Sequence, residues 1–76
     1  MPFVVGHMMY ALRQMKKHSN SRVAGASTLN GRVFAWVKPA NATSAVKMAV
    51  NSVDDLKHVS DTFTDKPLAH FIKWTH

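Results

Sequence analysis

The sequence predicts a small α+β domain in which two helices pack on one face of an antiparallel sheet, with the element order α-β-β-β-α-β. Three observations predict it: apolar residues recur at helical spacing near the start, an Asn-Gly pair separates two strand-like segments, and a serine precedes two aspartates where a second helix would begin. The chain has 76 residues, 46% of them apolar, which suits one domain spanning residues 1–76. Because a chain of this size buries only about 60% of its unfolded surface, we expect a thin core.

A first helix is predicted over residues 7–18. Its apolar face is made by residues three and four positions apart: Val5, Met8, Met9, Leu12 and Met15. Positive side chains crowd its last turn and a half: Arg13, Lys16, Lys17 and His18. Cations at this end complement the helix dipole, and the same cluster would equally bind a phosphate.

The next segment carries the signature of a β-hairpin. Asn30-Gly31 is the preferred pair for a two-residue type I′ turn, in which both residues have positive φ. The flanking segments 22–29 and 32–38 are the predicted strands, the second being rich in β-forming residues. Pro39 ends this second strand, because proline cannot donate a backbone hydrogen bond.

The segment 45–63 has two readings, since its apolar residues fit either a strand followed by a helix or one long helix. Ser52 with Asp55 three residues later is typical of a helix N-terminus. We therefore predict a strand over 45–50 and a helix over 53–63. Apolar residues alternate again after Pro67, which predicts a final strand over 68–75.

The two-residue turn fixes which side chains of the hairpin share a face of the sheet. One face would carry the facing pairs Leu29 with Arg32, Ser27 with Phe34, Gly25 with Trp36, and Val23 with Lys38. The other would carry Thr28 with Val33, Ala26 with Ala35, and Ala24 with Val37. The first face therefore has two aromatic rings between two cations, and the second is small and mostly apolar.

Either face of this hairpin could be covered by the helices. The aromatic face is favoured as the core, because burying Phe34 and Trp36 would stabilise a chain this short, while Arg32 and Lys38 could extend to water along their alkyl stems. In the alternative, the helices cover the small face. The two rings would then be exposed between the cations, as in a platform that stacks single-stranded bases.

Charge is distributed unevenly along the chain, which has 10 Lys and Arg, 4 Asp and Glu, and a formal net charge of +6. Seven of the ten basic residues lie in residues 1–53, which contain no acidic residue, and all four aspartates lie in 54–65. The five histidines add positive charge below about pH 6.5. This asymmetry indicates one positive surface, or else charges placed for solubility and helix electrostatics.

Signs of catalysis and of metal binding are weak in the sequence. The absence of cysteine excludes a disulfide framework and a thiol nucleophile. The chain has no phosphate-binding glycine loop, dinucleotide motif or nucleophile elbow, and its histidines are not at ligand spacing. His58 and His70 would be the candidates for a metal-independent ribonuclease, which needs a histidine near cations. We expect no enzymatic activity, no cofactor and no metal.

The first functional hypothesis is a non-catalytic nucleic-acid-binding module that binds RNA or single-stranded DNA with little sequence specificity. The candidate binding residues are Arg13, Lys16, Lys17, Arg22, Arg32, Phe34, Trp36 and Lys38. The α-β-β-β-α order resembles that of double-stranded-RNA-binding domains. This resemblance in element order implies an expectation about the fold alone.

The alternative hypothesis is a small adaptor or inhibitor that binds an acidic protein surface, such as that of a nucleic-acid-processing enzyme. Five methionines and free sheet edges suit a protein interface, and small viral and mobile-element proteins share this profile. The chain has neither the pattern of a signal peptide nor an apolar run long enough to span a membrane. We expect a cytoplasmic protein without membrane contact, as a monomer or a small homo-oligomer.

Overall fold

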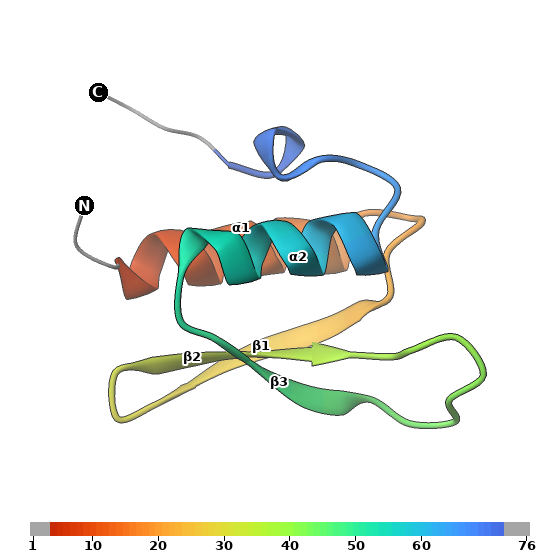
Figure 1. The fold of residues 1–76 in the computed structure, drawn as a ribbon, viewed down its shortest axis with the longest axis horizontal. Helices are drawn as coiled ribbons and strands as arrows, with labels where there is room; N and C mark the ends of the chain where they lie inside the picture. The colour runs from red at the N-terminus through yellow and green to blue at the C-terminus, as the bar shows by residue number, and fades with distance from the viewer. Residues whose placement is uncertain (1–3, 73–76) are drawn as a thin grey trace.

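The computed structural model describes residues 4–72, in which two helices lie over one side of a three-stranded sheet (Figure 1). The elements are α1 (Val5–Lys17), β1 (Val23–Leu29), β2 (Arg32–Val37), β3 (Val46–Val50), α2 (Val53–Phe63) and the 3₁₀ helix η1 (Leu68–His70). The predicted α+β class and the order α-β-β-β-α are confirmed. The split of segment 45–63 into a strand and a helix is confirmed as well.

The sheet has the strand order β1-β2-β3, and both pairs of strands are antiparallel. Asn30 and Gly31 have φ angles of 53° and 75°, as a type I′ turn requires. Next to this turn the strands pair as predicted: Leu29 with Arg32, Thr28 with Val33, Ser27 with Phe34, Ala26 with Ala35, and Gly25 with Trp36. The Asn-Gly pair therefore specifies the register of most of the hairpin.

The predicted pairing is wrong at the start of β1. The register shifts between Val23 and Gly25, so that Val23 lies opposite Val37 instead of Lys38. Ala24, which was expected opposite Val37, becomes the extra residue and is exposed. The shift turns Val23 into the core, where it is only 3% exposed, whereas the predicted register would have placed it on the other face.

The helices cover the small face of the sheet and leave the aromatic face open. α1 packs against β1 and β2, and α2 packs against β3 and α1. Val33, Ala35 and Val37 are completely buried beneath the helices, while Trp36 is exposed. The favoured expectation that Phe34 and Trp36 form the core is therefore wrong.

The volume of the core comes from the helices, which explains why the sheet can bury its smaller side chains. The largest helical contributions are Met8, Leu12 and Met15 from α1, and Leu56, Val59 and Phe63 from α2. Ala11 of α1 and Ala35 of β2 are both inaccessible to solvent, and such small side chains let a helix and a sheet approach closely. No large ring from the sheet is needed beneath the helices.

A hydrogen-bonded cap begins α2 where the sequence predicts it. The hydroxyl of Ser52 accepts from the backbone N–H of Asp55 at 3.1 Å. The carboxylate of Asp55 in turn accepts from the backbone N–H of Asn51 at 2.7 Å. The first bond satisfies a donor that the first turn of a helix leaves unpaired, and the second ties that turn to the residue before the cap.

The final strand predicted over 68–75 is wrong for its described part, and residues 73–75 lie outside the described residues. Leu68 to His70 form η1, which lies on the side of the helices away from the sheet (Figure 1). Leu68 and Phe71 are both buried, and their spacing of three residues matches the period of a 3₁₀ helix. The apolar residues that suggested a strand therefore belong to a 3₁₀ turn that packs on α2.

Candidate nucleic-acid interface

The aromatic side of the sheet, here called the open face, is formed by Gly25, Ser27, Leu29, Arg32, Phe34, Trp36, Lys47 and Ala49. β2 is the central strand and places Arg32, Phe34 and Trp36 at alternate positions along one line. Outward side chains on one strand are about 7 Å apart. The open face therefore carries a cation and two rings in a row along its central strand.

The two rings stay accessible because three of their four neighbours across the strands are small. Phe34 lies between Ser27 of β1 and Ala49 of β3, and Gly25 lies beside Trp36. Trp36 is 38% exposed, and Phe34 is half-buried. The indole N–H of Trp36 donates to the hydroxyl of Ser27 at 3.1 Å, which holds the ring on the sheet with its polar atom satisfied.

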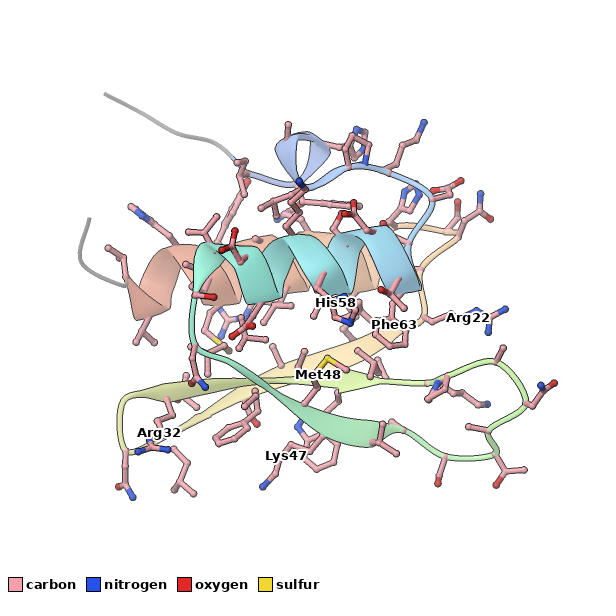
Figure 2. The ribbon with its side chains drawn as sticks, viewed as in Figure 1. Arg22, Arg32, Lys47, Met48, His58 and Phe63 are labelled. Carbon is pink, nitrogen blue, oxygen red and sulfur yellow. The ribbon has the colours of Figure 1, made fainter. Side chains whose placement is uncertain are left out.

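Lys47 is a second cation of the open face and was absent from the predicted site. It lies opposite Trp36 on β3, and its ammonium group is 4.8 Å from the centre of the Phe34 ring. Figure 2 shows Lys47 pointing away from the helices and Met48 pointing toward them. The alternation of the predicted strand 45–50 separates these two side chains, but only the pairing of β3 with β2 shows that Lys47 lies beside the rings.

Two of the predicted cations, Arg22 and Lys38, lie at the end of the sheet opposite to Arg32. Figure 2 shows Arg22 and Arg32 at these two ends. Arg22 and Lys38 line a shallow hollow of about 370 Å³ together with Ser21 and residues 39–42. Both cations are exposed. Since residues 1–53 contain no aspartate or glutamate, no carboxylate side chain belongs to the sheet or to this hollow.

The remaining predicted cations lie on the other layer of the molecule. Arg13, Lys16 and Lys17 are exposed on α1, and the sheet separates α1 from the open face (Figure 1). The structure therefore divides the predicted site in two. Arg32, Phe34 and Trp36 share one surface, and the basic end of α1 forms another.

His58 and His70, the two histidines considered for a ribonuclease, have different neighbours in the structure. His70 of η1 lies against His18, with ring centres 5.8 Å apart, and against Phe71. His58 of α2 has its ring nitrogen 3.4 Å from the hydroxyl of Thr62. Among residues 4–72, no group of three or more histidine, aspartate or glutamate side chains is arranged to hold a metal ion.

His18 also joins α1 to the segment that follows α2. Its Nε2 atom forms an ion pair and hydrogen bond with the carboxylate of Asp65, which also accepts from the amide of Asn20 at 3.0 Å. The hydrogen bonds from His18 and Asn20 hold the pKa of the Asp65 carboxyl below its ordinary value. This cluster has a structural role because it ties together residues that are far apart in the sequence.

Within the described residues, neither helix combines the length and the hydrophobicity that crossing a membrane requires. The α-β-β-β-α arrangement agrees with the first five elements of the order expected from the sequence. Comparisons of the chain with protein-family models, with curated proteins and with solved structures found no match.

Proposed function

We propose that this protein is a non-catalytic module that binds single-stranded RNA or DNA on the open face, with little sequence specificity. The observation that carries the proposal is the row of Arg32, Phe34 and Trp36 on an uncovered sheet, with Lys47 beside the rings. Aromatic rings on a sheet stack unpaired bases, and neighbouring cations neutralise the phosphates.

Base stacking would depend mainly on Trp36. Its ring is the more exposed of the two, whereas the ammonium group of Lys47 lies over Phe34. Replacement of a stacking ring by alanine typically costs about 1–3 kcal/mol of binding free energy per base. Stacking of this kind accepts every base, which is the reason for expecting little sequence specificity.

Electrostatic attraction would hold the phosphates along the same surface. Four cations border the rings or lie at the end of their strand: Arg22, Arg32, Lys38 and Lys47. Because the sheet has no carboxylate side chain, nothing on this surface repels a phosphate. Four phosphate contacts on a single strand correspond to a slope of about −3 for the logarithm of affinity against the logarithm of salt concentration.

The test is fluorescence anisotropy with a labelled mixed-sequence oligonucleotide of about ten residues, as RNA and as DNA, at about 50 mM salt. We expect Trp36→Ala to weaken binding about 5- to 150-fold, which corresponds to the stacking energy above. Lys47→Ala should weaken binding to all sequences alike and make the salt slope shallower by about 0.7.

The matched control is Lys57→Ala, which removes the same charge from the exposed surface of α2. It should leave the affinity within about twofold of the unmodified protein, since it does not belong to the sheet. Absence of binding to either oligonucleotide at about 50 mM salt would contradict the proposal. In that case an acidic protein surface becomes the better candidate for a partner of the same cations and rings.

A further inference from the structure

The hollow at the end of the sheet is a second feature of the basic surface, and its two cations come from segments 16 residues apart in the chain. Arg22 precedes β1 and Lys38 follows β2, and residues 39–42 of the β2–β3 connection form the rest of its wall with Ser21. Its volume of about 370 Å³ is larger than a phosphate group needs. The hollow therefore has room for a phosphate and is lined by one cation from each of the two segments.

Backbone hydrogen bonds fix the positions from which these two side chains start. The N–H of Lys38 donates to the carbonyl of Arg22 at 2.9 Å, and the N–H of Arg22 donates to the carbonyl of Phe63 at 2.6 Å. Val23 and Val37, the next pair along the strands, point into the core. Arg22 and Lys38 follow these two residues at the same end of the sheet, and Figure 2 shows Arg22 pointing outward past the end of α2.

The opposite wall of the hollow is a tight turn. The N–H of Ala42 donates to the carbonyl of Pro39 at 3.1 Å, and Asn41 has a positive φ of 71°. A turn held in this way gives the hollow a defined edge beyond the end of β2. Lys38 is two residues past Trp36, so this edge lies about 7 Å of strand length beyond the more exposed ring.

We infer that the Arg22–Lys38 hollow binds the terminal phosphate of a short single strand whose neighbouring base stacks on Trp36. The inference rests on the proposed function. A terminal phosphomonoester carries about −1.5 to −2 charges at neutral pH, against −1 for an internal phosphodiester, and two cations match the higher charge better. The guanidinium of Arg22 adds a planar pair of donors that suits phosphate oxygens.

The first experiment compares labelled oligonucleotides of about six residues that carry a 5′-phosphate, a 3′-phosphate or no terminal phosphate. We expect one phosphorylated form to bind about tenfold more tightly than the unphosphorylated one, and its identity gives the direction of the strand along β2. Arg22→Ala combined with Lys38→Ala should abolish this preference. Arg13→Ala combined with Lys16→Ala removes the same charge from α1 and should preserve it.

The outcome separates this inference from the proposed function. Equal affinity for all three oligonucleotides, with binding still dependent on Trp36, overturns the phosphate site and leaves the proposed function intact. If no oligonucleotide binds, a titration with inorganic phosphate, monitored by NMR of the backbone amides, tests whether the hollow binds phosphate. Shifts confined to Arg22, Lys38 and residues 40–42 support the site, and their absence overturns it. A thermal melt of each variant verifies that the fold is retained.

Discussion

Gly31 has a φ of 75°, a backbone conformation that side chains with a Cβ atom rarely adopt. A Cβ atom built at this position meets nothing within 4 Å, so a substitution there acts through backbone strain alone. We expect Gly31→Val to lower the free energy of unfolding by about 1–3 kcal/mol, measured by urea denaturation. Asn30→Asp is the control, since aspartate tolerates positive φ, and it should change stability much less. Equal effects of the two substitutions would argue against strain at Gly31.

A second effect at this scale concerns the ion pair between His18 and Asp65. The hydrogen bond from His18 lowers the pKa of Asp65 in the folded protein, so Asp65 stabilises the fold above its ordinary pKa of about 3.9. This contribution is lost as the pH falls through the lower folded-state pKa. We expect Asp65→Asn to melt at a lower temperature than the unmodified protein at pH 7, and the gap to narrow as the pH falls below about 3.9.

The control for this pH dependence is Asp61→Asn, which removes a carboxylate from an exposed position of α2. It should show a smaller difference in melting temperature at pH 7. A gap for Asp65→Asn that does not narrow as the pH falls below about 3.9 would contradict the assigned role of the ion pair.

At the scale of the element, the start of α2 depends on Ser52. Its hydroxyl accepts from the backbone N–H of Asp55 at 3.1 Å, and alanine cannot replace this bond. We expect Ser52→Ala to cost about 1 kcal/mol in chemical denaturation, and Ser52→Asp to retain most of the stability. An unchanged or raised stability for the alanine variant would mean that residue 52 lies inside a helix, where alanine is the better residue.

The segment after α2 shows how an element depends on what it packs against. The hydroxyl of Ser60, which is completely buried, donates to the carbonyl of Lys66 at 2.6 Å, and the hydroxyl of Thr64 donates to the carbonyl of Ser60 at 2.7 Å. These bonds turn the chain back over the helices, away from the edges of the sheet. A local alternation of apolar residues cannot reveal such a reversal.

At the scale of the whole molecule, the two faces of β2 differ in what they contribute to stability. Ala35 is completely buried under the helices, whereas its neighbour Trp36 is 38% exposed. We expect Ala35→Leu to destabilise the protein by about 1–3 kcal/mol, because the extra methylene groups have no room. Trp36→Ala should cost about 1 kcal/mol, well below the 3–5 kcal/mol typical of a buried aromatic ring.

Thermal melts of both variants, converted to free energies, provide the comparison. A loss of about 3–5 kcal/mol for Trp36→Ala would place this ring in the core and contradict the open face. The small expected cost also makes Trp36→Ala a usable variant for the binding experiment, since it should remain folded.

Features that depend on neighbours in the chain were predicted correctly from the sequence. The Asn30-Gly31 turn determined the pairing as far as Gly25, and Ser52 determined where α2 begins. All four aspartates follow the strands in the sequence, so the sheet carries cations and no carboxylate side chain. In each case a short-range hydrogen bond, a φ preference or a simple count carries the information.

Which face of the sheet is covered was decided only by the tertiary structure, because both faces of the hairpin carry apolar side chains. The helices bring large residues such as Leu12 and Met15, so the sheet completes the core with Val33, Ala35 and Val37. Burial of a residue depends on the volume that its partner surface supplies, and that volume comes from distant parts of the chain. The same packing turned the rings to the solvent and set Lys47 beside them.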